Sequence, residues 1–299
     1  MSLPTIGLAG ATGNLGVPIL SALLTAGYTV TVLSRIGGNS SKITAHTNLT
    51  VKSVDFASAH SLREALEGVE VVVSCVATSA MGSQNPLIDA CIAAGVRRFI
   101  PAEFGMDSQN PLAMQLPVCA MKVSTQTYLR EQSRLHKDFT WTAIANGLFL
   151  DWGIEMGFIV DAKKHTATLY NGGDVPFSAT TLTDIAKAVV GVVSNLSATA
   201  DRVVYVHSAC VTQNQLIQYV KDKDGKAWDV EVKSTETVKQ ESFVELEKGD
   251  VDAAMLGFSV VGMFDEKCGC NFEGKLDNGI LGVKVLSTDE VRKVVEGCM

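Results

Sequence analysis

The stretch Pro-Thr-Ile-Gly-Leu-Ala-Gly-Ala-Thr-Gly-Asn-Leu-Gly, residues 4–16, decides the fold of this chain. It places a short apolar strand before a run of three glycines spaced by two residues, and an apolar helix over 17–26 follows. In this order one glycine makes a tight turn, one lets the backbone approach a pyrophosphate, and one lets the helix pack closely on the strand. The helix N-terminus adds free N–H groups and the positive end of its dipole. We therefore expect a dinucleotide site here, rather than an ordinary glycine-rich turn, built from Gly10, Thr12, Gly13, Asn14, Leu15 and Gly16.

The next apolar stretch, 28–33, indicates which dinucleotide binds. It is rich in β-branched residues and is predicted to form the second strand. A site for NAD places an acidic residue near the end of this strand to hold the ribose 2′-hydroxyl. Here the strand ends in Ser34-Arg35, and no carboxylate follows until Asp55. Arg35 can pair with a 2′-phosphate, and Lys42 can add a second positive charge, so the sequence favours NADP(H) unless Arg35 is an ordinary solvated arginine.

Composition excludes several classes of protein. The 299 residues fit one large or two modest domains, and 46% of them are hydrophobic while 19% are charged. A net charge of −7 disfavours nucleic acid as a partner, because neutralising phosphates requires a basic face. No uninterrupted apolar run is long enough to span a bilayer. Since the first strand starts almost at once, we expect no signal peptide. We also expect a cytoplasmic protein with a small-molecule ligand.

The seven cysteines do not predict a metal or disulfide framework. Their number is odd, their spacing is unpaired, and most of them lie in apolar contexts typical of buried free thiols. Cys268-Gly-Cys270 is the alternative, a metal or redox pair, but no His or Cys cluster stands nearby. The five histidines show no triad or metal spacing, and the pair Arg97-Arg98 is expected to cap a helix end.

Strand and helix patterns alternate through the first half of the chain and predict a Rossmann-type, doubly wound parallel sheet. The nucleotide-binding part is expected over 1–146 and about 180–225. Gly-rich and aromatic segments at about 147–179 and 226–299 are expected to form a smaller, discontinuous substrate-binding lobe over the carboxyl ends of the strands. A capping box at Ser287-Thr-Asp-Glu290 predicts a terminal helix. Further strands are expected at 49–54, 69–76, 98–101, 140–145 and 202–207, and helices at 58–66, 86–94, 122–135 and 182–194.

Three further stretches carry a resemblance to a known family. They are Phe-Ile-Pro-Ala-Glu-Phe-Gly-Met-Asp at 99–107, Pro-Val-Cys-Ala-Met-Lys-Val-Ser-Thr-Gln at 117–126, and Asn-Gly-Leu-Phe-Leu-Asp at 146–151. Together with the glycine loop and Ser34-Arg35, they resemble the NmrA-like and isoflavone-reductase-like branch of the atypical short-chain dehydrogenases/reductases. The resemblance covers nearly the whole chain. The usual short-chain dehydrogenase pattern of a Tyr and a Lys four positions later is absent, since Tyr128 is followed by Leu-Arg-Glu-Gln.

The resemblance implies a role for Lys122. In the reductases of this branch, one lysine at the start of a helix acts as acid/base and orients the nicotinamide ribose. The chemistry is independent of the resemblance, because hydride transfer leaves negative charge on a substrate and a buried ammonium group can stabilise or protonate it. The alternative is a surface lysine, although a cation is unfavourable at the start of a helix. Two departures are Gln126, where these reductases often carry an arginine, and Ala102, where they carry a serine.

The same resemblance suggests the remaining site residues. Ala77, Phe104, Lys122 and Gln126 are expected to contact the cofactor, and Glu103 is expected to be structural. The substrate is expected to contact Phe104, Asn146, Phe149, Trp152 and Met156, although such an aromatic and methionine cluster is as often plain core.

Three functions remain open from the sequence. The first is an NADPH-dependent reductase of a small apolar compound, aromatic or polyketide-like, with an enone, carbonyl or benzylic ether. The second is a non-catalytic, NmrA-type dinucleotide sensor with a protein partner, which does not need Lys122. The third uses the retained cofactor for isomerisation or dehydration. The substrate, and whether the protein is a homodimer, are not set by the sequence.

Overall fold

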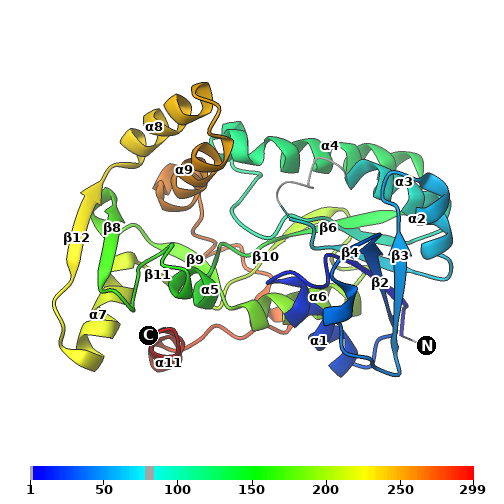
Figure 1. Ribbon diagram of the computed structural model, residues 1–299, viewed down its shortest axis with the longest axis horizontal. Helices are drawn as coiled ribbons and strands as arrows, with labels where there is room; N and C mark the ends of the chain where they lie inside the picture. The colour runs from blue at the N-terminus through cyan, green and yellow to red at the C-terminus, as the bar shows by residue number, and fades with distance from the viewer. Residues whose placement is uncertain (1–2, 78–83) are drawn as a thin grey trace.

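A seven-stranded parallel sheet forms the centre of the computed structural model, which describes residues 3–77 and 84–299 (Figure 1). The strands lie in the order β10-β6-β5-β4-β1-β2-β3. The chain adds strands outward from β1 on one side, and then outward from β4 on the other side. This is the doubly wound order of dinucleotide-binding folds, so the predicted Rossmann-type sheet is confirmed. The strands are β1 (Ile6–Ala9), β2 (Val30–Arg35), β3 (Leu49–Val54), β4 (Val71–Ser74), β5 (Arg98–Ile100), β6 (Thr140–Ala145) and β10 (Arg202–Tyr205).

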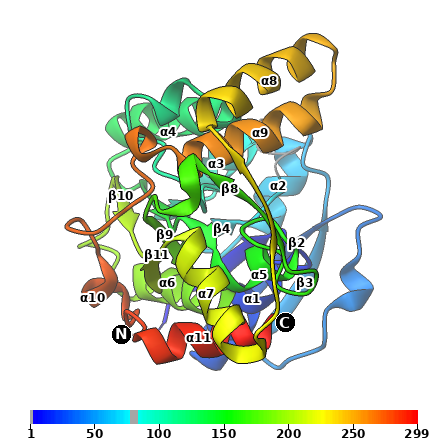
Figure 2. The same cartoon turned by 90° about the vertical axis from the view of Figure 1, so that its left-hand side faces the viewer.

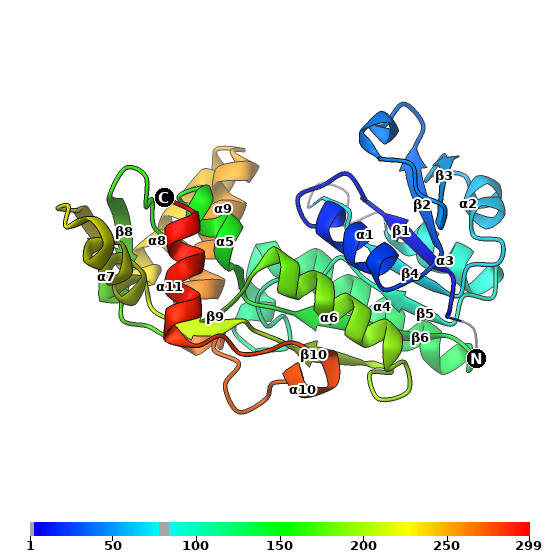
Figure 3. The ribbon, with the colours of Figure 1, turned by 90° about the horizontal axis from the view of Figure 1, so that it is seen from below.

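Helices cover both faces of this sheet. Helices α1 (Gly16–Thr25) and α6 (Leu182–Ser194) lie side by side on one face, as seen from below in Figure 3. Helices α2 (Ala59–Ala65), α3 (Gln84–Ala93) and α4 (Ala120–Leu135) lie on the other. Each face has its own apolar cluster, because the central strands are buried on both sides and read as continuous apolar runs.

The chain leaves the carboxyl ends of β6 and β10 to build a second lobe, which faces the viewer in Figure 2. Its small sheets have the orders β11-β9-β7 and β12-β8, and its helices enclose a separate apolar cluster. The short helix α10 (Asn278–Leu281) packs instead on α6. The elements of the lobe are β7 (Leu148–Phe149), α5 (Leu150–Glu155), β8 (Thr166–Tyr170), β9 (Phe177–Thr180), β11 (Ala209–Val211), α7 (Gln213–Asp224), β12 (Asp229–Lys233), α8 (Thr235–Glu247), α9 (Val251–Phe264) and α11 (Thr288–Gly297).

Helix α7 packs with the second lobe, whereas the sequence-based division grouped it with the nucleotide-binding part. Its buried residues Leu216, Ile217 and Val220 belong to the apolar cluster of the second lobe. The helix also contacts α11, whose predicted capping box is present: Ser287 accepts from the Glu290 N–H, and Glu290 accepts from the Ser287 N–H. The exact domain limits stay a prediction.

Arg98 does not cap a helix end, contrary to expectation. It stands on β5, and its guanidinium group is buried, with bonds of 2.8 Å to Thr140 Oγ1, 2.7 Å to Thr142 Oγ1 and 3.0 Å to Thr199 Oγ1. Burial lowers the pKa of Arg98 to about 10. Its neighbour Arg97 pairs with Glu70 at 2.5 Å. A buried arginine is tolerated here because hydroxyl groups from separate elements satisfy its donors.

The cysteines match their sequence-based interpretation. All seven are free thiols, and five of them are buried. Burial raises the pKa of Cys119 to about 11 and that of Cys270 to about 12, so neither thiol ionises near neutral pH. Within residues 3–77 and 84–299, no group of His, Cys, Asp or Glu side chains has the arrangement of a metal site. In the same residues, no helix combines the length and apolar character needed to cross a bilayer.

Candidate functional site

The glycine loop joins β1 to α1 and has the shape that a dinucleotide requires. Gly10 has a φ of +81°, and a Cβ added to it would lie 2.3 Å from the Cys75 carbonyl oxygen. A Cβ on Gly16 would lie 2.0 Å from the Gly10 carbonyl oxygen, so Gly16 permits the close packing of helix on strand. By contrast, a Cβ on Gly13 would meet only the Gly10 oxygen, at 3.5 Å. Gly13 is therefore free of internal crowding, as expected for the glycine that a phosphate approaches.

The start of α1 has no side-chain cap in the described residues, although the Val17 N–H donates to the Gly13 carbonyl at 3.1 Å and Pro18 has no N–H. Leu15 occupies the N-cap position of this helix. Thr12, Gly13 and Asn14 are exposed just before it. A helix start without a side-chain cap and the positive end of the helix dipole together favour an anion. These residues fit the pyrophosphate of a dinucleotide.

Arg35 lies at the end of β2, as the sequence predicted. Its side chain is exposed, and none of the ion pairs among the described residues includes it. Gly38 makes room for it, since a Cβ there would lie 3.0 Å from Arg35 Cγ. Lys42 ends the short helix Ser40–Lys42 and is also exposed, while Ala77 is exposed after β4. Arg35 and Lys42 are therefore available to a phosphate, without a competing carboxylate.

Lys122 stands in the first turn of α4 and is only 8% exposed. Its ammonium group donates to the backbone carbonyl of Glu103, in the loop that follows β5. A Cβ on Gly105 would lie 3.1 Å from Lys122 Nζ, so the missing side chain leaves the ammonium group its space. No carboxylate in the described part of the chain forms an ion pair with Lys122. The structure thus holds a buried cation against a neutral oxygen.

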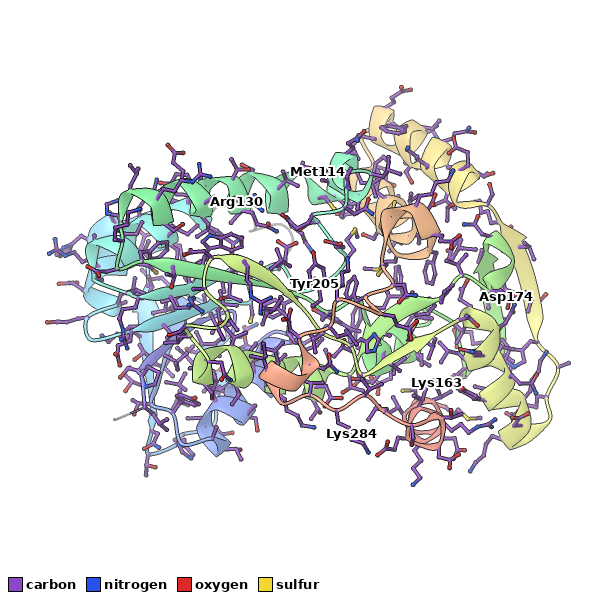
Figure 4. All side chains as sticks on the ribbon, turned by 180° about the vertical axis from the view of Figure 1, so that it is seen from behind. Met114, Arg130, Lys163, Asp174, Tyr205 and Lys284 are labelled. Atoms are coloured by element: carbon purple, nitrogen blue, oxygen red, sulfur yellow. The ribbon has the colours of Figure 1, made fainter. Side chains whose placement is uncertain are left out.

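Gln126 lies one turn after Lys122 and is engaged by the protein itself. Its Nε2 donates to Glu103 Oε2 at 2.9 Å and to Ser108 Oγ at 2.8 Å. Its Oε1 accepts from Gln109 Nε2 at 2.6 Å and from Arg130 Nη2 at 3.2 Å. Arg130 extends this network along α4 (Figure 4). Gln126, expected at the cofactor, therefore ties the loop after β5 to α4 and supports the position of Lys122.

Three unpartnered polar atoms mark the carboxyl ends of β4, β5 and β6. Five buried side-chain atoms lack a hydrogen-bond partner in the described residues. Two of them are the indole nitrogens of Trp141 and Trp228, and the others are Ser74 Oγ, Glu103 Oε1 and Asn146 Oδ1. Ser74 ends β4, Asn146 directly follows β6, and Glu103 follows β5 by three residues. Because buried polar groups are nearly always paired, their concentration at neighbouring strand ends points to a ligand site.

The predicted substrate residues divide into two groups. Phe104 is half-buried against the apolar cluster of the nucleotide-binding part, and Asn146 is fully buried at the end of β6. Phe149 and Trp152 meet edge to face, with ring centroids 6.1 Å apart, at the start of α5. Met156 is 64% exposed at the end of α5. Phe104 and Asn146 therefore accompany Lys122 at the strand ends, whereas the other three lie on the segment that leads into the second lobe.

Sequence reasoning missed the contacts of Asp107, which fix the loop after β5. Its carboxylate accepts from Tyr205 at 2.9 Å and from Lys275 at 2.5 Å, and the Lys275 ammonium group lies 4.3 Å from the Tyr205 ring centroid. Burial, followed by the nearby Asp107, raises the pKa of Tyr205. Tyr205 lies in the middle of the molecule, between the sheet and the second lobe (Figure 4). Lys275 is 168 residues from Asp107, so no local signal announces this contact.

A separate cavity of about 650 Å³ lies between α1, α6 and α10. Its lining is mainly apolar and includes Pro18, Ala22 and Leu281. Helices α1 and α6 cover the face of the sheet opposite to α4. The cavity is therefore not part of the site around Lys122.

Comparison with known proteins agrees with this fold. The model of the NmrA-like family matches residues 4–260. The oxidoreductase poxI of Penicillium oxalicum is 31% identical over 296 residues, covering 95% of this chain and 91% of that protein. The structure of AtPrR2 with NADP+ and (+)pinoresinol aligns with a TM-score of 0.75 and 23% identity over 99% of both chains. The complex of leucoanthocyanidin reductase with NADPH from Vitis vinifera aligns with a TM-score of 0.78 and 16% identity over 98% of this chain and 99% of that one. Both solved structures therefore share the fold of this chain.

Proposed function

Because this chain belongs to the NmrA-like family, we propose that it is an NADPH-dependent reductase with Lys122 as its acid/base. Its substrate is a small, largely apolar compound of the aromatic or secondary-metabolite type, with an enone, carbonyl or benzylic ether. The observation that carries the proposal is the buried ammonium group of Lys122, which is held by a backbone carbonyl at the carboxyl end of the sheet.

The residues that would hold the cofactor form two groups. The start of α1 and the exposed loop at Gly13 would hold the pyrophosphate, and Arg35 with Lys42 would hold the 2′-phosphate. Lys122, Phe104 and Ala77 would hold the nicotinamide half. When bound, NADPH supplies a hydride. Both solved relatives described above contain NADP+ or NADPH, which supports this choice of cofactor.

Lys122 handles the charge that hydride transfer creates. Its ammonium group stabilises negative charge on the substrate oxygen or donates a proton to it. The Glu103 carbonyl is a neutral partner, so it orients the ammonium group without neutralising it. The network around Gln126 holds that carbonyl in place. These are the contributions that a reductase needs from the protein beyond binding.

The test is turnover of a substrate panel by wild type and by Lys122→Met. We expect the wild-type protein to oxidise NADPH with some members of a panel of enones, quinones and phenylpropanoids. Lys122→Met keeps the aliphatic bulk and removes the charge, so kcat should fall by about 10²- to 10⁴-fold, the usual contribution of general acid–base groups.

The matched control is Lys137→Met, the same substitution at an exposed lysine just beyond α4. It should leave kcat unchanged, and NADPH should still bind to both variants. Near-normal turnover by Lys122→Met would remove Lys122 from the mechanism. If NADPH binds to wild type but nothing in the panel is reduced, a dinucleotide sensor replaces the reductase as the function.

A further inference from the structure

Glu103 is the buried residue near Lys122 that a purely structural role does not explain. Its carboxyl group is 2% exposed, and only Oε2 is bonded, to Gln126 Nε2 at 2.9 Å. Oε1 is buried and has no hydrogen-bond partner among the described residues. A buried oxygen left unpaired is costly. If Glu103 were needed only to hold Gln126, one acceptor oxygen would suffice, and a neutral glutamine could provide it.

Asn146 presents a second oxygen of the same kind. Its Nδ2 donates to the Gly147 carbonyl at 3.0 Å, and this bond fixes the orientation of the amide. Its backbone N–H donates to Gly105, and its carbonyl accepts from Thr180 Oγ1 at 2.6 Å. Oδ1 therefore has no partner in the described part of the chain, although the residue is fully buried.

Gly105 lies beside the ammonium group of Lys122 and is bonded to the backbone of Asn146. The Gly105 carbonyl accepts from the N–H groups of Asn146 and Gly147, at 3.1 and 2.9 Å. A Cβ on Gly105 would lie 3.1 Å from Lys122 Nζ, and this ammonium group also binds the carbonyl of Glu103. Glu103 and Asn146 thus flank the residue that borders Lys122. The backbone of both residues therefore lies beside the group proposed as the acid/base.

Resting on the proposed function, we propose that Glu103 Oε1 and Asn146 Oδ1 accept hydrogen bonds from donor groups of the ligands bound beside Lys122. Both atoms are oxygens with free lone pairs, and the bond of Asn146 Nδ2 to the Gly147 carbonyl fixes the Asn146 amide. The ligand must therefore bring O–H or N–H groups. Two sources have this chemistry, namely a hydroxyl group on the substrate and the carboxamide of the nicotinamide. Buried acceptors reject an analogue that lacks the donor, because they are then left unpaired.

Two measurements on the wild-type protein separate the sources. The first measurement uses 4-(hydroxyphenyl)but-3-en-2-ones that carry the hydroxyl group at each ring position in turn. It compares each of them to the unsubstituted phenyl compound. It measures kcat/KM, and also binding to the complex of the protein with NADP+ by calorimetry. The second compares NADP+ with its 3-acetylpyridine analogue, which lacks the carboxamide N–H groups. A preference of about 10- to 100-fold for the donor in either comparison supports the proposal and identifies the source.

The variant Glu103→Gln assigns that preference to Glu103. Its amide oxygen can still accept from Gln126, while an NH2 donor replaces the free acceptor. We expect the preference to shrink to about twofold or to reverse. The control is Ser108→Ala, which removes another partner of Gln126 but no free acceptor, and it should keep the wild-type preference.

Equal binding of donor and donor-free compounds in both wild-type comparisons overturns the proposal, as does a Glu103→Gln variant that keeps the full preference. If Glu103→Gln does not fold, the wild-type comparisons decide. The calorimetric comparisons do not depend on turnover. A lack of turnover with a clear donor preference would therefore reject the reductase and retain the acceptor pair.

Discussion

At the level of a single side chain, we predict that Arg35 decides between the two dinucleotides. It is exposed at the end of β2 and forms no ion pair with a described carboxylate. A charge-assisted bond to a 2′-phosphate contributes about 1.5–3 kcal/mol. We therefore expect NADPH to bind at least about tenfold more tightly than NADH, and Arg35→Ala to remove most of this difference. Calorimetric titration of both cofactors measures it, and equal affinities in wild type would refute the assignment.

The sequence carries a signal where the position of a residue is local. Lys122 was singled out by the family resemblance and by its unfavourable place in the first turn of a helix, and the structure buries it there. Glu103 and Ser108, which accept from Gln126, come from a separate loop, so no local signal predicts these bonds, and the expected contact of Gln126 with the cofactor stays a prediction. Arg98 was assigned to a helix end, because the threonines that bury it lie 42 and 101 residues away.

At the scale of elements, the same contrast between local and distant signals appears. Helix α6 begins and ends where predicted, because Thr181 caps it and its apolar positions repeat with helical spacing. Strand β12 was not predicted, since its only apolar signal is two valines between charged residues, and four of its five residues are exposed. It pairs in parallel with β8, which is far away along the chain. Its existence depends on that partner rather than on its own sequence.

The glycine loop gives a prediction at this scale, since its glycines serve different purposes. Gly13→Ala meets no internal obstacle and should change the free energy of unfolding by less than about 0.5 kcal/mol. It should nevertheless weaken NADPH binding, because the methyl group occupies the approach to the phosphates. Gly16→Ala places a Cβ 2.0 Å from the Gly10 carbonyl oxygen and should lower both stability and binding.

Thermal unfolding and cofactor titration of the two loop variants separate these effects. The informative variant is Gly13→Ala, because its fold is expected to survive. If it binds NADPH as tightly as wild type, the loop does not hold the phosphates at Gly13. The same variant, if strongly destabilised, would contradict the roles assigned to the two glycines.

At the scale of the whole molecule, the two lobes are joined by polar contacts that lie far apart in sequence. Asp277 binds the Arg202 guanidinium group at 2.8 and 3.2 Å, and its Oδ2 accepts from the Tyr205 N–H at 2.9 Å. Asp107 and Lys275 form a further ion pair across the same junction. These contacts attach residues 275–277 to β10 and to the loop after β5. The position of the second lobe over the strand ends is thus built into the folded chain.

His207 lies at this junction and makes the stability of the molecule depend on pH. Its Nδ1 bonds Ser178 Oγ on β9 at 2.8 Å, while its backbone exchanges two hydrogen bonds with the Asn278 side chain. Burial lowers the pKa of His207 below its usual value, and the charge of Glu273 opposes this only in part. The folded protein therefore holds a neutral imidazole between β9 and α10.

The sign of the pH effect follows from that lowered pKa. Above the ordinary histidine pKa of about 6.5, His207 is neutral in both states and its stabilising contribution is complete. As the pH falls below this value, the unfolded chain binds a proton that the folded chain resists, so the free energy of unfolding decreases by up to about 1.4 kcal/mol per pH unit. The loss ends once the pH is below the pKa of the folded state. Urea unfolding between pH 7.5 and 5 should show this decline in wild type. His207→Asn keeps a polar atom near Ser178 and removes the titrating ring. Its free energy of unfolding should be lower at pH 7.5 but fall less steeply as the pH decreases. An unchanged slope of the free energy of unfolding against pH would show that another group controls the pH dependence.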